Sequence, residues 1–347
     1  MPRFRTSPED FEVEERPLYP PDGDGPFLWL WIEKRGLDTA ELARRLAEAC
    51  DLPRREVGWA GRKDRHAVTR QAMTVPASAE KKLQSFELDG ATVLETTRTR
   101  ERLRAGQLIG NRFRLTLREV EPGQAADAIQ ALDRIAVSGL ANRFGAQRYG
   151  KDGRNDERGR KLLFGGRVGG DRRRAFLMIS ALQSRVFDDV LKRRPIDNLW
   201  PGDLALHHKS GDWRWVDNPA DFEQALRRFE VSPTGPIFGT KVKRTRGKAA
   251  ELEEQVMAEH DLPPMAQLEP PKGLRIFGDR RALRVLPGQI SHSYDAQTQR
   301  FEVRFDLPAG SYATVLLEEL FPDGLVEGPA TDDAITDDAQ AGSVSES

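Results

Sequence analysis

The alternation of apolar and polar positions predicts strands near both ends of the chain. Residues 113–117 and 301–305 each place apolar side chains at every second position, with charged or polar residues between them. This pattern is typical of a strand with one buried face. Residues 27–32 form a continuous aliphatic and aromatic run, which favours a strand buried on both faces. A further short strand is expected from residue 67 onward.

Helices are predicted between these strands and in the middle of the chain. Asp38 suits a helix N-cap, and Glu41 stands in the capping-box position three residues later. Apolar residues then recur at helical spacing over 42–49, and the same spacing appears over 126–136 and 179–190. Near the end of the chain, Ser311 is placed to cap a helix that runs through Leu320.

The order of these elements predicts an α+β protein with a discontinuous domain. A chain of 347 residues exceeds the usual size of one core. The strands lie at both ends, whereas the middle is rich in arginine, glycine and proline. We therefore expect a first domain built from residues 1–138 and 287–321, a second domain inserted at 139–286, and an acidic disordered tail at 322–347.

The charge distribution indicates a nucleic-acid partner despite a net charge of −1. Seven acidic residues and no Lys or Arg occupy 322–347, so the other residues carry about +6. Basic residues gather in two places, ten of them over 148–174 and five over 241–248. Such clusters fit a phosphate backbone, although they also occur on solvated loops.

The single cysteine and the start of the chain bear on the compartment. Cys50 excludes an intrachain disulfide and fits a reducing compartment, and we expect it to be a small buried residue. The first residues lack the apolar region of a signal peptide, and no apolar run has membrane-spanning length. We therefore expect a cytoplasmic protein with no membrane partner.

The candidate for chemistry is Asp64, in the segment GRKDRHAVTRQ at 61–71. It lies between Lys63 and Arg65, follows a glycine-led turn and precedes the expected strand. Neighbouring cations favour an ionised carboxylate, and a loop presents it to a substrate. The competing interpretation is a solvated, charge-rich turn.

This segment occurs with five others in an order that resembles the TruD family of tRNA pseudouridine synthases. The six are TSPEDFEVEE (6–15), GRKDRHAVTRQ (61–71), GNRF (110–113), NRFGAQRYG (142–150), SPTGP (232–236) and LPAGSYAT (307–314). The resemblance implies an α+β fold: a pseudouridine-synthase catalytic domain with a mixed, mainly antiparallel sheet, interrupted by an inserted α/β TRUD domain. It also implies isomerisation of uridine, at position 13 of tRNA, without a cofactor.

The resemblance assigns roles to particular side chains. Asp64 is implied as nucleophile or base, with the uridine swung into a cleft. Phe113 is implied to stack on the uracil and Asn111 to make a polar contact with it, and Phe11 and Tyr312 are further pocket candidates. Possible RNA contacts or supports of Asp64 are Arg5, Lys63, Arg65, Arg143 and Arg148. Phe113 could instead be a core residue of its strand, Phe11 could staple the N-terminus, and Tyr312 could pack at a helix start.

Two other functions fit parts of the pattern. A non-catalytic RNA-binding protein could use the same cleft, and a metal-dependent nuclease could use some of the many carboxylates. We expect no metal site, because His207 and His208 are adjacent in sequence and no nearby cysteine accompanies them. The glycine-rich stretch 165–170 lacks the ending of a phosphate-binding loop. A monomer that binds tRNA is the expected state.

Overall fold

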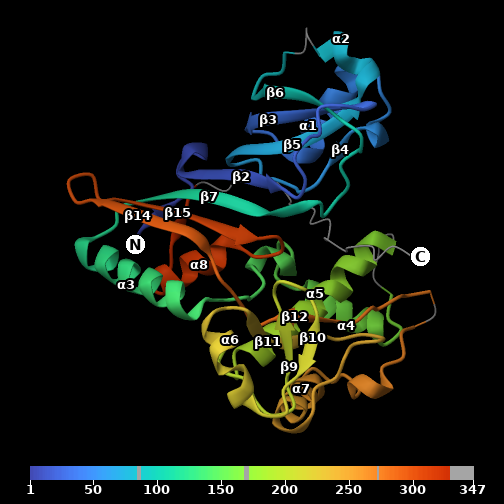
Figure 1. Ribbon diagram of the computed structural model, residues 1–347, viewed down its shortest axis with the longest axis vertical. Helices are drawn as coiled ribbons and strands as arrows, with labels where there is room; N and C mark the ends of the chain where they lie inside the picture. Colours follow the sequence, from blue (N-terminus) through green and yellow to red (C-terminus); the bar gives the residue numbers. More distant parts are fainter. Residues whose placement is uncertain (84–86, 168–171, 272, 329–347) are drawn as a thin grey trace.

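The computed structural model describes residues 1–83, 87–167, 172–271 and 273–328, and it is built around two sheets (Figure 1). Within these residues the larger sheet has ten strands, in the order β14-β15-β7-β2-β5-β3-β6, with β1, β4 and β16 attached at its sides. Its strands are β1 (Arg3–Phe4), β2 (Phe11–Pro17), β3 (Phe27–Arg35), β4 (Gly58–Trp59), β5 (Val68–Pro76), β6 (Ala91–Thr99), β7 (Leu108–Arg118), β14 (Gly288–Asp295), β15 (Arg300–Pro308) and β16 (Val326–Glu327).

The larger sheet is mixed, because β2 pairs with β5 and β1 pairs with β16 in parallel while the other pairs are antiparallel. The two ends of the chain meet in its centre, where β15 and β2 both pair with β7. The predicted α+β class with a mixed, mainly antiparallel sheet is confirmed, as are the strands expected at 27–32, 113–117 and 301–305.

Helices cover one face of this sheet in two groups. Val13 pairs with both Thr69 and Phe113, so these three side chains point to the same side. On that side, α3 (Pro122–Ser138) and α8 (Ala313–Leu320) pack on β7 and β15 in one apolar core. The helix α1 (Thr39–Ala49) packs on β3 and β5 in another, and its Thr39 hydroxyl donates to Gln71. The centre of this face, at β2, lies between the two groups.

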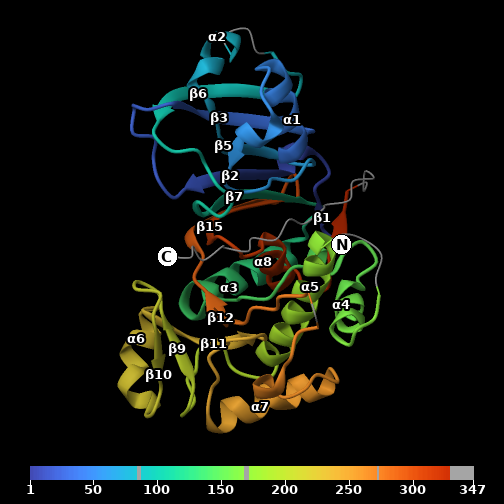
Figure 2. The ribbon, with the colours of Figure 1, turned by 90° about the vertical axis from the view of Figure 1, so that its right-hand side faces the viewer.

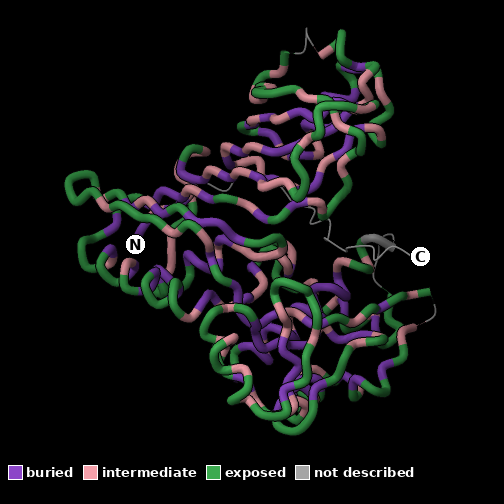
Figure 3. Tube along the Cα trace, in the orientation of Figure 1, coloured by how far each residue is buried: buried purple, intermediate pink, exposed green. Residues whose placement is uncertain are grey.

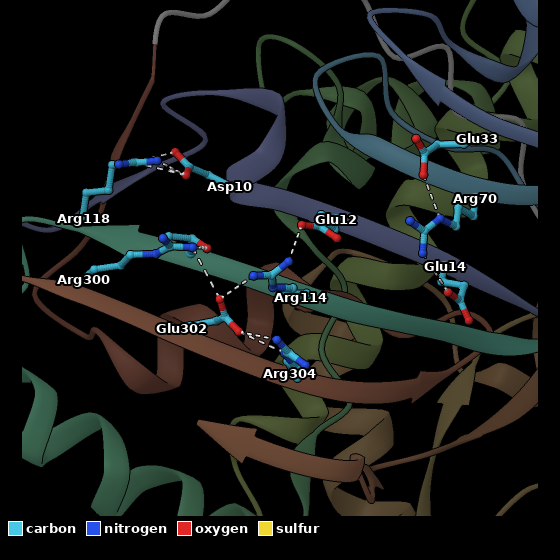
Figure 4. Close-up of polar contacts among 11 residues, drawn as sticks. Asp10, Glu12, Glu14, Glu33, Arg70, Arg114, Arg118, Arg300, Glu302 and Arg304 are labelled. Atoms are coloured by element: carbon cyan, nitrogen blue, oxygen red, sulfur yellow. Dashed lines mark hydrogen bonds and ion pairs between the residues drawn. The ribbon is translucent and has the colours of Figure 1, made fainter. Parts of the chain in front are cut away.

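The opposite face of the larger sheet carries arginines and carboxylates that alternate across the strands (Figure 4). Arg114 of β7 binds Glu12 of β2 and Glu302 of β15, each at 2.9 Å. Arg70 of β5 binds Glu33 of β3 at 2.8 Å. These side chains are partly exposed, so each pair contributes little on its own. The charges keep this face solvated, and the chemistry has to be sought on the other one.

The second sheet has four antiparallel strands in the order β10-β9-β11-β12, and a small pair β8–β13 connects it to the rest. The strands are β8 (Leu140–Ala141), β9 (Leu204–His207), β10 (Trp213–Trp215), β11 (Val231–Ile237), β12 (Asp279–Ala282) and β13 (Arg284–Val285). The remaining helices are α2 (Glu80–Leu83), α4 (Asn155–Leu163), α5 (Arg172–Leu191), α6 (Glu223–Arg227) and α7 (Gly247–Glu259). Figure 2 shows α3 and α8 lying between β15 and this second sheet.

The part of the chain that carries the second sheet has its own buried segments, in the lower part of Figure 3, and Ala205 of β9 and Val231 of β11 lie in a small core there. Apolar residues of α5 and α7 pack together in one core. Two buried ion pairs accompany it, Arg280 with Glu253 and Arg194 with Asp203. All four side chains are at most 2% exposed. Removing one partner of such a buried pair destabilises the protein, because the other charge is then buried without compensation.

The local predictions are confirmed in most places and wrong in one. Asp38 caps α1 by accepting from the Glu41 N–H at 2.8 Å, and Cys50 is free and buried. The closing helix is present, but Ser311 is not its cap. The helix begins at Ala313 with Tyr312 as N-cap, one residue too late for the Ser311 hydroxyl, which lies 3.5 Å from Asn142 Oδ1.

Two other stretches extend beyond the described residues. The acidic tail was expected from Pro322, but Val326–Glu327 form β16 because they pair in parallel with β1. Residues 329–347 lie outside the described part of the chain. So do 168–170 of the glycine-rich stretch and 171 of the first basic cluster. No helix in the described ranges is long and apolar enough to cross a membrane.

Candidate active site

A cleft of about 1040 Å³ opens where the uncovered centre of the larger sheet meets the part of the chain that carries the second sheet. Residues of β2 and β7, the loop from Trp59 to Asp64, the segment 310–314, and the stretch around Phe144 all line it. The last of these belongs to the region predicted to be inserted. Segments far apart in sequence therefore form a single concave site.

Asp64 lies in the wall of this cleft, in the loop between β4 and β5. Its side chain is 34% exposed, and Arg5 Nη2 lies 3.1 Å from Asp64 Oδ2. Arg5 follows directly after β1 and has a left-handed backbone with φ of 57°. This conformation is costly for a residue with a side chain, and such outliers gather at functional sites. The strained turn directs the guanidinium at the carboxylate.

A buried lysine holds the backbone of the Asp64 loop from below. Lys34 of β3 is 1% exposed, and its Nζ donates to the carbonyl of Asp64 at 2.8 Å and to that of Leu37 at 2.5 Å. Burial lowers the pKa of Lys34 to about 7, although the Asp64 carboxylate acts in the opposite direction. The sequence analysis did not single out this lysine, which lies within an otherwise ordinary strand.

The two cations next to Asp64 in sequence bind other carboxylates. Lys63 Nζ lies 2.7 Å from Glu15 Oε2, and both side chains are at most 3% exposed. Arg65 Nη2 lies 3.3 Å from Asp38 Oδ2. Gly61 makes room for the buried pair, because a Cβ there would lie 2.8 Å from both charged atoms. Lys63 and Arg65 thus anchor the loop, whereas Arg5 makes the ion pair with Asp64.

Aromatic residues form the floor and one side of the cleft. Phe11, Phe113 and Tyr312 all line it together with Asp64. Phe113 is also a core residue, 6% exposed and stacked on Phe305 at 5.2 Å. The Arg5 guanidinium lies 4.2 Å over the ring of Phe11. Tyr312 is only half-buried, so it offers the most accessible ring of the three.

Three polar atoms in the cleft lining have no hydrogen-bond partner within the described ranges. They are Asn111 Oδ1, Arg5 Nε and Thr314 Oγ1, and each is shielded from solvent. Buried polar groups are nearly always paired, so an unpaired one points to a missing ligand or water. The three atoms are covered as they stand, so a ligand in the cleft could pair with them only after their side chains turn toward it.

The other predicted arginines divide between the cleft and the surface. Arg148 lines the cleft, and its guanidinium donates to the hydroxyls of Ser184 and Ser180. Arg143 lies outside the lining and binds Glu318 and Glu319 at 2.9 and 3.4 Å.

Arg281 of β12 also lines the cleft, next to Phe144. The sequence analysis missed it, since it belongs to none of the six motifs. The pair of arginines at 280–281 looks like any charged strand end until the fold is known.

In the described part of the chain, no group of three His, Cys, Asp or Glu side chains could hold a metal ion. His208 Nε2 lies 2.8 Å from the Ser232 hydroxyl, far along the chain from the carboxylate of the cleft.

Comparison with known proteins finds the same family over most of the chain. The family model described as "tRNA pseudouridine synthase D (TruD)" matches residues 2–166 and 172–320. A tRNA pseudouridine synthase D from Anaeromyxobacter sp. (strain Fw109-5) is 38% identical, covering 95% of each chain. One from Thermus thermophilus is 37% identical, covering 95% of this chain and 93% of the other.

A solved structure supports the fold independently of close sequence similarity. The crystal structure of a protein from Methanosarcina mazei, named as a candidate tRNA pseudouridine synthase D (TruD), superposes with a TM-score of 0.74. It covers 92% of this chain and 93% of its own at 20% identity. With the family model matched over nearly the whole length, the chain belongs to the tRNA pseudouridine synthase D (TruD) family.

Proposed function

We propose that the protein isomerises uridine to pseudouridine in tRNA, at position 13, with Asp64 as the catalytic carboxylate. One observation carries this proposal: Asp64, paired with Arg5, lines the same cleft as Phe11, Phe113 and Tyr312. A site for a swung-out pyrimidine needs an ionised carboxylate, an aromatic surface and unsatisfied polar groups within reach of one another.

The reaction breaks the N1–C1′ bond of uridine and forms a C5–C1′ bond, while C5 loses its proton and N1 gains one. No electron and no external group is transferred, so the reaction itself requires no cofactor. Asp64 acts as a nucleophile or a base in this exchange. Arg5 fixes the position of one carboxylate oxygen of Asp64, because the guanidinium donates to Oδ2.

The geometry suggests how the base is held. Tyr312 is the accessible aromatic face, and we assign the stacking of the uracil chiefly to it. Phe113 is too well covered by Phe305 to offer a full face, so it serves as the floor of the pocket together with Phe11. The unpaired amide oxygen of Asn111 is a natural acceptor for the uracil N3–H.

The two parts of the chain then have separate tasks. We assign residues 1–138 and 287–321 to a catalytic domain and 139–286 to an inserted domain that grips RNA with Arg148 and the basic clusters. The tRNA lies across the cleft between them. We expect the enzyme to act as a monomer in the cytoplasm.

The direct test uses tRNA that carries tritium at uridine C5. Wild-type protein is expected to release tritium, and carbodiimide-blocked primer extension is expected to map the product to position 13. Asp64→Asn should bind tRNA with wild-type affinity and release no tritium. Tritium release by this variant at the wild-type rate would remove Asp64 from the mechanism.

The same material separates the two other functions. A protein that binds tRNA but never releases tritium is an RNA-binding protein rather than a synthase. Activity that EDTA abolishes, together with strand cleavage on a denaturing gel, would indicate a metal-dependent nuclease.

A further inference from the structure

Two arginines of the inserted region enter the cleft without a carboxylate partner among the described residues. Arg281 donates from Nε to the Asn142 carbonyl at 3.1 Å and from Nη2 to the Gly310 carbonyl at 2.9 Å and to Asn142 Oδ1. Arg148 donates only to the hydroxyls of Ser180 and Ser184. Every one of these acceptors is neutral, so both positive charges remain uncompensated by hydrogen-bonded anions.

Arg284 shares this pattern, because it donates only to the neutral oxygens of Ser232, Ser138, Leu226 and Val231, but it is buried outside the cleft lining. Arg143, Arg194 and Arg280 each bind at least one carboxylate at 2.9 Å or less. Both side chains are partly buried, and a charge that is partly removed from water without a counter-ion costs free energy unless a ligand supplies the opposite charge. Arg281 and Arg148 are therefore positioned as an anion site rather than as structural ion pairs.

The two guanidinium groups share one aromatic neighbour. Both lie over the ring of Phe144, Arg281 at 4.3 Å and Arg148 at 5.4 Å from its centroid. Burial lowers the pKa of Arg281 to about 10; Tyr312 and Asp188 act in the opposite direction, and the charge of Arg148 acts in the same direction as burial. Two mutually repelling cations around one ring would be relieved by a single anion between or beside them.

The nearest carboxylate does not supply that anion. Asp188 of α5 accepts from the Tyr149 hydroxyl at 2.6 Å and from the Phe144 N–H at 3.0 Å. Burial raises the pKa of Asp188, whereas the charge of Arg281 acts in the opposite direction, so the two groups, both in the described part of the chain, interact through space without a hydrogen bond between them. The task of Asp188 is to hold the backbone of Phe144, and thereby the ring on which both arginines rest.

The position of this pair relative to the base site identifies the anion. Phe144 lies 6.1 Å from Tyr312, centroid to centroid, and Arg281 binds the carbonyl of Gly310, two residues before Tyr312. Resting on the proposed function, we propose that Arg148 and Arg281 bind an RNA phosphodiester adjacent to the swung-out uridine. Because Arg281 grips Gly310, this phosphate contact also orders the segment that presents Tyr312.

The salt dependence of tRNA binding tests this assignment separately from catalysis. Binding is measured by fluorescence titration at several KCl concentrations with the Asp64→Asn background, which cannot turn over. Each lost phosphate contact flattens the slope of log K against log salt by about 0.7 to 0.9. We expect this loss in Arg281→Gln and in Arg148→Gln, but not in Arg281→Lys, which keeps the charge.

The matched control is Arg143→Gln, which removes an arginine of the same region that is already neutralised by Glu318 and Glu319. Its slope should equal that of the background protein. If the slopes of Arg281→Gln and Arg148→Gln are also unchanged, with both variants folded by circular dichroism, the phosphate site is refuted. If one of these two variants does not fold, the slopes of the other variant and of Arg281→Lys test the phosphate site.

A second measurement identifies the phosphate. A short RNA stem-loop with a neutral methylphosphonate at either linkage flanking the target uridine should bind the background protein more weakly. The same substitution should have no further effect on the double variant Arg148→Gln/Arg281→Gln, in which both guanidinium contacts to that phosphate are already removed. Full additivity would place the phosphate elsewhere and overturn the proposal. If the wild-type protein releases no tritium, the proposed function is disproved, while the salt slopes still report whether the two arginines bind a phosphate.

Discussion

The buried ion pair beneath the catalytic loop provides a quantitative prediction. Lys63→Met removes the ammonium that lies 2.7 Å from Glu15 Oε2 and leaves a carboxylate that is 0% exposed without its partner. At that distance the attraction is about 6 kcal/mol for an effective dielectric constant of about 20. Desolvation offsets part of it, so we expect the free energy of unfolding to fall by about 3–5 kcal/mol.

The measurement is urea unfolding followed by tryptophan fluorescence and circular dichroism. The double variant Glu15→Gln/Lys63→Met should be more stable than Lys63→Met alone, because a neutral amide needs no buried counter-charge and still accepts from the Ala72 N–H. The exposed Lys209 supplies a control, since Lys209→Met should change stability by less than about 0.5 kcal/mol. A loss below about 1 kcal/mol in Lys63→Met would show that the pair does not anchor the loop.

Three other changes have defined outcomes. Below about pH 7 Lys34 is protonated in both the folded and the unfolded protein, and above that pH the folded protein loses this proton first. The unfolding free energy of wild type should therefore rise with pH between about 7 and 10, by up to about 1.4 kcal/mol per pH unit. Urea titrations at each pH measure this rise, with Lys34→Met as the reference. Glu253→Gln leaves the buried Arg280 without a counter-charge, so the free energy of unfolding should fall by about 3–5 kcal/mol in urea titrations followed by circular dichroism. Gly145→Ala places a Cβ 2.9 Å from Tyr312 Cδ1, and displacing the ring to relieve this clash costs about 1–3 kcal/mol. We therefore expect kcat/KM in the tritium assay to fall roughly tenfold without loss of tRNA binding.

The sequence was sufficient for elements whose signal is local. Alternation over 113–117 and 301–305 has a single physical explanation, a strand with one buried face, and β7 and β15 follow it. Asp38 caps α1 because a short carboxylate before an apolar helical repeat satisfies the first free N–H groups. The cap predicted at Ser311 failed because one residue of shift in the helix start cannot be resolved from spacing alone.

The partners of the charged residues could not be read in the same way. Lys63 and Arg65 are the neighbours of Asp64 along the chain, yet the ion pair with Asp64 is made by Arg5, 59 positions away. Successive residues in an extended loop point in different directions, so adjacency in sequence gives no information about contact. Arg281 enters the cleft only because β12 pairs with β11 in the second sheet.

The parallel pairing of β16 with β1 has a consequence for synthesis of the protein. Val326 pairs with Arg3, and the N–H of Gly328 donates to the carbonyl of Phe4. Phe4 immediately precedes the turn that directs Arg5 toward Asp64. A ribosome must therefore translate more than three hundred codons before β1 acquires its parallel neighbour, although its antiparallel partner β7 is complete by Arg118. Nascent polypeptide would therefore lack, for most of that time, the strand that borders the Arg5 turn on its other side, and we expect this turn to be fixed only once translation is almost finished.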